Sequence, residues 1–169
     1  MSYKTITQES YDATAEELIS KMKGISHITL ICRDIDKSAE LFCDLFGAEE
    51  VYSSDNHNFS ISREKFLLID DLWIALMEGG PIDRSYNHIA FHINDDELHC
   101  FEEKIKKYNL DILPGRLRDP REGKSIYFYD YDNHLFELHT GDLKSRLKFY
   151  HSKDSEFNLS PSIAAIPAT

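Results

Sequence analysis

Cysteines and long apolar runs are both scarce in this sequence. The three cysteines, Cys32, Cys43 and Cys100, are odd in number and lack C-x-x-C spacing, which fits neither a disulfide framework nor a zinc knuckle. We therefore expect reduced, buried thiols. No apolar run approaches the ~18–20 residues that span a bilayer, and the polar start of the chain has no signal-peptide core. These absences predict a cytoplasmic protein with no membrane partner.

Positive charge is also in short supply. Lysine and arginine number 19 against 30 aspartates and glutamates, which gives a formal net charge of −11. This balance argues against nucleic acid as a partner, because phosphate backbones are bound by clustered basic residues. An acidic protein still binds a small anion when its few cations are concentrated in one pocket. The length of 169 residues suits one domain, or two small modules that share a core.

A short internal repeat organises the chain. The run SHITL at residues 26–30 is echoed by NHIAF at 87–91, and an acidic residue follows each histidine at the same interval, Asp34 and Asp95. Each acidic residue opens an amphipathic helical pattern, and Gly47 ends the first of them. Strand-like runs follow each helix, at 58–69 and 71–78 in the first half and at 124–132 and 134–140 in the second. The pattern predicts an α+β fold of two βαβββ modules.

Two segments lie outside the repeat. Residues 1–23 form an N-terminal arm, in which acidic residues early and lysines late predict a short helix that ends near Gly24. The first module is predicted at 24–80 and the second at 81–151. Residues 152–169 lose periodicity and gain serine and proline, so we expect a loose C-terminal tail.

Three potential metal ligands can point inward from the predicted strands: His27, His88 and Glu137. Taken singly, a strand histidine is more often a hydrogen-bonded structural residue, and the glutamate in HLFELHT could be exposed. The two histidines are related by the repeat, however, and a pseudo-twofold packing of the modules would set them across the axis from each other. A bound ion explains this placement best.

The fourth position of the site is informative. Aligning DLWIALMEG with NHLFELHTG puts Ala75 opposite Glu137, so only three protein ligands are expected. Two imidazoles and one carboxylate leave coordination positions open for water and substrate, as a catalytic metal requires. The same ligand set suits non-haem iron oxygenases, so ligand type alone does not identify the metal.

The ordered motifs of the chain resemble a known family. The runs SHITLI, SREKFLLI, LWIALMEG, YNHIAFHI and KSIYFYDYDNHLFELHTGDLKSRLKFYH are similar to those of the fosfomycin resistance proteins, in their FosX hydrolase branch, within the vicinal oxygen chelate (glyoxalase) superfamily. The resemblance covers roughly residues 24–151. It implies a homodimer whose modules pair between subunits, with Mn2+ held by His27 of one chain and His88 and Glu137 of the other.

The resemblance also implies how the substrate is bound, position by position. The phosphonate ligands of the family correspond to Thr29, Tyr127 and Arg146, with Ser125 and Lys124 in the preceding loop. The small carbon skeleton would lie against aromatic residues, which are Trp73, Phe66 and Tyr86. A lysine in PREGKS, where the glutathione-using branch binds potassium, implies no potassium requirement. From the residues alone, Arg146 is equally consistent with a solvated charge on a terminal helix. The residues alone favour Tyr127 and Trp73 as core aromatics.

The implied reaction is the opening of the fosfomycin epoxide by water to a vicinal diol. Fosfomycin joins a dianionic phosphonate to a strained oxirane, so its site needs fixed positive charge at one end and a Lewis acid at the other. Glu64, in the run SREKF, falls where the FosX hydrolases have a carboxylate and the thiol-using branch has a small residue. It is expected to act as the general base, while Arg63 and Lys65 point the other way and stay solvated. An isolated REK triplet would otherwise suggest a plain surface glutamate.

Other functions remain open on this scaffold. A thiol transferase would add glutathione, cysteine or bacillithiol to the epoxide, and Glu64 argues against it. A metal-free drug-binding dimer would need no ligand triad, whereas His27, His88 and Glu137 are all present. An epimerase or extradiol dioxygenase has no need for the KSIYFY and GDLKSR motifs. No functional role is predicted for the remaining strand and helix histidines, His92, His99, His134 and His139.

Overall fold

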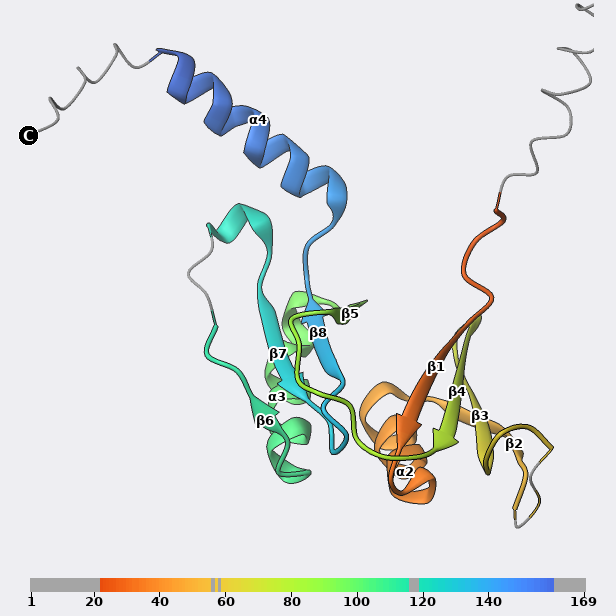
Figure 1. The fold of residues 1–169 in the computed structure, drawn as a ribbon. Coiled ribbons are helices and arrows are strands. Elements are labelled where there is room, and N and C mark those ends of the chain that lie inside the picture. Colours follow the sequence, from red (N-terminus) through yellow and green to blue (C-terminus); the bar gives the residue numbers. More distant parts are fainter. Residues whose placement is uncertain (1–21, 56, 58, 116–118, 160–169) are drawn as a thin grey trace, which may run out of the picture.

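Two four-stranded sheets form the framework of the computed structural model (Figure 1), which describes residues 22–55, 57, 59–115 and 119–159. The first sheet has the order β1-β4-β3-β2 and the second the order β5-β8-β7-β6. In both, the first strand pairs parallel with the last and the other pairs are antiparallel. The predicted βαβββ repeat is therefore confirmed. The strands are β1 (His27–Cys32), β2 (Glu49–Ser53), β3 (Glu64–Ile69), β4 (Leu72–Glu78), β5 (His88–His92), β6 (Asp111–Ile112), β7 (Ser125–Tyr129) and β8 (Leu135–His139).

The helix of the first module begins and ends where its sequence predicts. In α2 (Ile35–Phe46) the Asp34 side chain accepts a hydrogen bond from the Lys37 amide at 3.0 Å, which caps the first turn. The helix ends at Gly47, whose φ of 68° is a left-handed conformation that glycine adopts without steric cost. In the second module the pattern from Asp95 is realised as a 3-10 turn, η1 (Asp95–Glu97), followed by α3 (Leu98–Lys107).

The hydrophobic core is shared by the two modules and gathers around α2. Its buried side chains come from both sheets and both helices, and they include Phe42 of α2 and Phe136 of β8, whose rings pack edge to face with centroids 5.7 Å apart. Phe46 of α2 likewise contacts Phe91 of β5 at 4.8 Å. Each sheet therefore buries the face that meets the helices, and its other face is left to build a site.

Polar contacts also join the modules. Arg33, directly after β1, donates from Nε to Asp132 Oδ1 at 2.7 Å, and the Asp132 side chain is only 2% exposed. The connecting segment 79–87, where the module boundary is predicted, is held by a hydrogen bond from the Ile82 amide to the Asp132 carbonyl at 3.1 Å. The turn between β7 and β8, which contains Asp132, therefore contacts both the end of β1 and the connecting segment.

The C-terminal segment differs from expectation. After the 3-10 turn η2 (Pro120–Glu122) and strands β7 and β8, α4 (Leu143–Leu159) continues eight residues beyond His151, where a loose tail is predicted. The residues from Ser152 to Leu159 contain no proline or glycine, so nothing in them opposes helical geometry. The helix predicted for the N-terminal arm and the remainder of the predicted tail lie outside the described residues.

The cysteines follow the prediction only in part. All three are free, and Cys32 in β1 is fully buried. Cys43 on α2 is half-buried, and Cys100 on α3 is exposed, so the prediction of three buried thiols is wrong for Cys100. The reason lies in the helix periodicity, since Cys100 occupies the solvent face of α3 while Ile105 occupies its core face.

Candidate active site

One face of each sheet carries nearly all the predicted site residues. In the first sheet the paired positions are His27 with Trp73, Thr29 with Ala75 and Phe66, and Ile31 with Met77 and Glu64. In the second sheet they are His88 with Leu135, Ala90 with Glu137 and Tyr127, and His92 with His139 and Ser125. The internal repeat relates the positions of the first sheet to those of the second one by one. Glu64 therefore takes the register position of Ser125. Ala75 takes that of Glu137, as the alignment predicts.

His88 and Glu137 are brought together by the parallel pair β5 and β8. The His88 Nε2 lies 3.1 Å from Glu137 Oε2, and the opposite ring nitrogen, Nδ1, is 2.8 Å from the Tyr86 carbonyl oxygen. A carbonyl only accepts, so Nδ1 carries a proton, and in the neutral imidazole Nε2 then has the lone pair that a metal would need. Metal-binding histidines commonly have this arrangement, in which the ring nitrogen that faces away from the metal donates to a backbone carbonyl.

Aromatic rings surround this pair. The Tyr127 ring packs edge to face on His88 with centroids 5.4 Å apart, and the Tyr86 ring lies 5.2 Å from His88 and 6.1 Å from Tyr127. Tyr127 is buried, whereas Tyr86 is 65% exposed in the single chain. Of the predicted aromatic lining, only Tyr86 lies in the second module, where its exposed ring stands beside His88 and Tyr127.

A chain of hydrogen bonds extends from Glu137 to Arg146. The Ser125 hydroxyl donates to Glu137 Oε1 at 2.5 Å and lies 2.8 Å from His139 Nδ1. On the other side of that ring, His139 Nε2 is 3.1 Å from Arg146 Nη2. Arg146 is placed by the first turn of α4, whose Ser145 amide donates to the Asp142 side chain at 2.6 Å. The Ser145 side-chain hydroxyl, and after it this amide contact, lower the pKa of Asp142.

Lys124 lies beside this chain but its ammonium group is directed elsewhere. Its Nζ pairs with Asp95 Oδ2 at 2.8 Å, and both side chains are more than half exposed. The pairing lowers the pKa of Asp95, with the hydrogen bond from Lys124 as the main cause. The Lys124 amide, in contrast, donates to Thr140 Oγ1 at 3.0 Å and ties the loop to the end of β8.

The first module contributes an aromatic face around His27. The Trp73 ring lies 4.4 Å from the His27 ring, and the Phe66 ring packs edge to face on Trp73 at 5.0 Å. Thr29 follows His27 by two residues on β1, so it lies on the same face, and it is exposed. The Trp73 Nε1 is buried and has no hydrogen-bond partner among the described residues. A donor in this position is ready for an acceptor that a ligand or another chain supplies.

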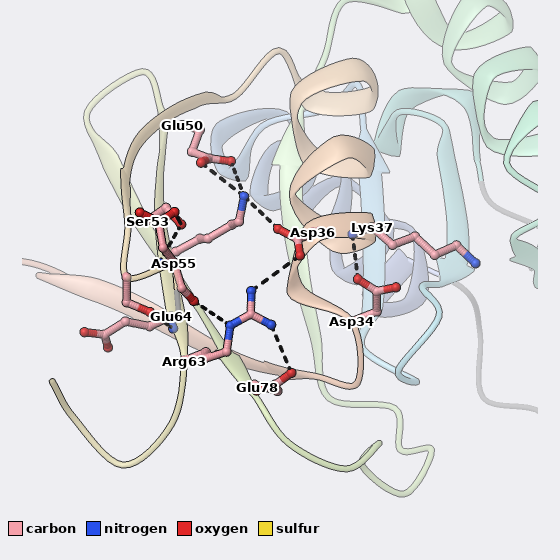
Figure 2. A network of polar contacts seen from close by, with 11 residues as sticks. Asp34, Asp36, Lys37, Glu50, Ser53, Asp55, Arg63, Glu64 and Glu78 are labelled. Carbon is pink, nitrogen blue, oxygen red and sulfur yellow. Dashed lines mark hydrogen bonds and ion pairs between the residues drawn. The ribbon is translucent and has the colours of Figure 1, made fainter. Parts of the chain in front are cut away.

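Glu64 is the first residue of β3 and points to the same face. Its backbone is fixed on both sides by Ser54, whose hydroxyl accepts from the Glu64 amide at 2.9 Å and whose amide donates to the Glu64 carbonyl at 3.0 Å. The residue is 9% exposed, and no ion pair or hydrogen bond joins its carboxylate to another described residue. Figure 2 shows this carboxylate directed away from the polar network behind the strand.

That network corrects the expectation that Arg63 and Lys65 stay solvated. Lys65 Nζ pairs with Asp36 and Glu50, each at 2.9 Å, and its side chain is only 13% exposed. Arg63 pairs with Asp36 at 3.5 Å and with Glu78 at 3.4 Å (Figure 2). The hydrogen bond from Lys65 lowers the pKa of Asp36. Burial alone would lower the pKa of Lys65, but its hydrogen bonds to Glu50 and Asp36 outweigh this and raise it.

The donor set fits a divalent ion only in part within one chain. The 3.1 Å between His88 Nε2 and Glu137 Oε2 matches two adjacent ligands of one ion at ~2.1 Å from each. Within the part of the chain that the structure describes, however, no three such side chains gather closely enough to bind a metal. His27 is thus not brought to the other two ligands by the fold of a single copy.

Comparison with known proteins places this arrangement in a family. The family model described as Glyoxalase/Bleomycin resistance protein/Dioxygenase superfamily matches residues 24–138. The fosfomycin resistance protein FosX of Listeria innocua serovar 6a is 53% identical over 131 residues, which cover 77% of this chain and 98% of the relative. The chain belongs to the FosX branch of this superfamily.

Two further relatives of this FosX-branch protein bear on the site. A crystal structure of a mutant FosX from Listeria monocytogenes, complexed with Mn(II) and 1S,2S-dihydroxypropylphosphonic acid, matches with a TM-score of 0.72 and 50% identity, covering 78% of this chain and all of that one. The metallothiol transferase FosB of Staphylococcus haemolyticus is more distant, at 38% identity over 81% of this chain and 97% of its own length. No helix in the described residues is long and apolar enough to cross a membrane.

Proposed function

We propose that this protein hydrates the epoxide of fosfomycin to a vicinal diol as a Mn2+-dependent enzyme. The greater similarity to FosX than to FosB supports hydration over thiol transfer. The observation that carries the proposal is the Glu64 carboxylate, which has no partner among the described residues and lies on the ligand-bearing face of its sheet. A carboxylate held against Arg63 or Lys65 would be neutralised, whereas those two cations are bound behind the strand.

The active site in this proposal is built from two copies of the chain. His27 lies on β1 and His88 on β5, and these strands are edges of their sheets. Both histidines are exposed in the single chain, and so is the Thr29 beside His27. Pairing the first module of one subunit with the second module of its partner covers these faces and brings His27 to His88 and Glu137. The proposed assembly is therefore a homodimer with two composite sites.

The phosphonate is proposed to bind at the Arg146 end of the site. The Arg146 guanidinium offers a planar set of donors for phosphonate oxygens, and Tyr127 and Thr29 add neutral hydroxyl donors. The Ser125 hydroxyl already donates its proton to Glu137. Ser125 is therefore proposed to contact the substrate either as an acceptor or by sharing that proton between Glu137 and the substrate. The ammonium of Lys124 must leave Asp95 to reach the substrate, which makes it the least direct of the proposed contacts.

Chemistry follows from the placement of the groups. A bound divalent ion supplies Lewis-acid polarisation of the oxirane oxygen. Glu64 removes a proton from the attacking water as the water oxygen bonds to the epoxide carbon and the ring carbon–oxygen bond breaks. The ring oxygen leaves as an alkoxide, and a proton taken up from solvent completes the diol, after which Glu64 returns its proton to solvent. Trp73 and Phe66 exclude bulk water from the small carbon skeleton, and Arg146 keeps the phosphonate fixed during attack.

The proposal is tested by incubating the Mn2+-loaded protein with fosfomycin, with and without added thiols, and reading the products by phosphorus NMR. We expect a vicinal diol at equal rates in both samples. A thiol adduct as the sole product would instead establish a FosB-like transferase. Binding without any product would favour a drug-sequestering dimer.

A further inference from the structure

His139, the last residue of β8, lies between the proposed metal-binding and phosphonate-binding groups. Its side chain is 13% exposed and contacts both sides of the site. Nδ1 lies 2.8 Å from Ser125 Oγ and 3.0 Å from the Lys124 carbonyl oxygen, and Nε2 lies 3.1 Å from Arg146 Nη2. None of the roles proposed above accounts for this residue.

The directions of these hydrogen bonds are set by chemistry. A guanidinium group only donates, so Nε2 of His139 accepts from Arg146 and the ring proton resides on Nδ1. That proton is shared between the Lys124 carbonyl and Ser125 Oγ. The Ser125 hydroxyl in turn donates to Glu137 Oε1. Every donor in the series from Arg146 to Glu137 therefore meets an acceptor.

The ring is also enclosed by backbone. A Cβ added at Gly141 would lie 2.9 Å from His139 Nε2, and one added at Gly123 would lie 3.2 Å from His139 Cε1. Gly123 has a φ of 82° and comes within contact of Gly141, so the two loops close over the imidazole. The His139 ring is therefore held in one orientation. Two loops contact its edge, and hydrogen bonds fix both of its nitrogens.

We propose that His139 is a positioning residue that aims the Arg146 guanidinium at the phosphonate. Arg146 extends from a helix attached to the body by a short loop, and His139 is the group that links its side chain to the sheet. Without this acceptor the long arginine side chain regains rotamer freedom, which binding must then remove again. The inference rests on the proposed function, because it takes Arg146 to be a phosphonate ligand.

A double-mutant cycle tests the inference by binding, independently of turnover. The probe is 1,2-dihydroxypropylphosphonate, titrated calorimetrically into the Mn2+-loaded protein. His139→Ala should weaken its affinity about 10- to 100-fold, the range for a lost hydrogen bond to a charged group. In an Arg146→Ala background the same change should have little further effect. His139→Gln, whose amide oxygen can reach the Nε2 position, should recover part of the affinity.

Controls separate positioning from folding and from the proposed reaction. His99→Ala, on the exposed face of α3, should bind like the wild type. Equal losses from His139→Ala in both backgrounds, or no rescue by Gln, would show a merely structural role and overturn the inference. Unchanged affinity in His139→Ala, or a wild type that binds no phosphonate, would overturn it too. Phosphonate binding without diol formation would refute the proposed function and leave the His139 assignment standing.

Discussion

Glu64 is the residue on which the proposed choice of hydration over thiol addition depends. It lies on β3 with its backbone fixed by Ser54 and its carboxylate unpaired among the described residues. Loss of a general base lowers rates by ~10²–10⁴-fold, so Glu64→Gln should reduce diol formation by about this factor while Mn2+ and phosphonate binding persist. Phosphorus NMR rates and calorimetry measure the two effects. Glu49→Gln, at an exposed position of β2, is the matched control. Near-native hydration by Glu64→Gln would contradict the assignment of Glu64 as the general base.

A smaller side chain at position 64 should change the reaction itself. Glu64→Gly removes the base and leaves space beside Phe66, so an added thiol gains access to the epoxide carbon. We expect the ratio of thiol adduct to diol to rise above that of the wild type when glutathione, cysteine or bacillithiol is supplied. An unchanged product ratio would show that position 64 does not govern the choice of nucleophile.

The cysteines provide a test of burial. Burial raises the pKa of the Cys32 thiol to about 12, because the thiolate is poorly solvated inside the core. Iodoacetamide at pH 8 should therefore alkylate exposed Cys100 in the native protein and spare Cys32 until the chain is unfolded. Mass spectrometry of peptides after short labelling times measures this. Equal labelling of the two would contradict the packing of β1 against α2.

Alternation along strands was enough to predict the faces of individual residues, but not their partners. It places His27, Glu64 and Glu137 correctly on the non-core side of their sheets. It also places His139 beside Glu137, yet the contact with Arg146 depends on how α4 leaves β8, which no local pattern encodes. The sequence likewise does not predict the partners of Lys65, because they lie on α2 and β2.

Strand β3 is the element that orients Glu64, and its rear face is fixed by the ion pairs of Lys65. Lys65→Met keeps the aliphatic stem but removes the links to Asp36 and Glu50. Because Asp36 is largely exposed, we expect a loss of only about 1 kcal/mol in unfolding free energy at pH 7. Urea unfolding measures the loss. Lys106→Met, which removes exposed pairs on α3, should cost less, and an unaltered midpoint for Lys65→Met would contradict the role of the network.

The effect of Lys65→Met should also depend on pH. The pKa of Asp36 is lowered in the folded state, so its contribution is present above the unfolded carboxyl pKa and is lost as pH falls through the folded value. The pKa of Lys65 is raised, so its contribution is present below the unfolded pKa and is lost as pH rises through the folded value. The difference between variant and wild type should therefore shrink at acidic pH. A constant difference down to acid unfolding would exclude the carboxylate pairing.

Elements with strong local signals were predicted closely. The Asp34 cap and Gly47 stop give α2 its bounds, whereas β3 begins only at Glu64, and β2 and β6 form where no separate strand is predicted. Among the described residues before β3, Ser60, Ile61 and Ser62 alternate as a strand would, but they pair with no strand. The length of α4 was underestimated because its polar residues carry no amphipathic pattern.

At the scale of the whole molecule, the fold leaves two incomplete half-sites. The first sheet presents His27 and Glu64, and the second presents His88, Glu137 and the route to Arg146. The shared core joins both sheets and both helices, and within the described residues the ligand candidates of the two faces do not gather into one cluster. The repeat in the sequence predicts both halves. In the proposed dimer a second chain would bring them together, at β1 and β5, which are edge strands of their sheets among the described residues.

The most direct test of this account mixes two inactive variants, His27→Ala and Glu137→Ala, under conditions that exchange subunits. In a mixed dimer one site carries both defects and the other is intact. Random exchange should therefore restore diol formation to about a quarter of the wild-type rate per chain, with one tightly bound Mn2+ in each mixed dimer. Each variant alone should stay inactive. Failure of the mixture to regain activity, with wild-type protein active and mixed dimers verified by mass spectrometry, would contradict a site shared between subunits.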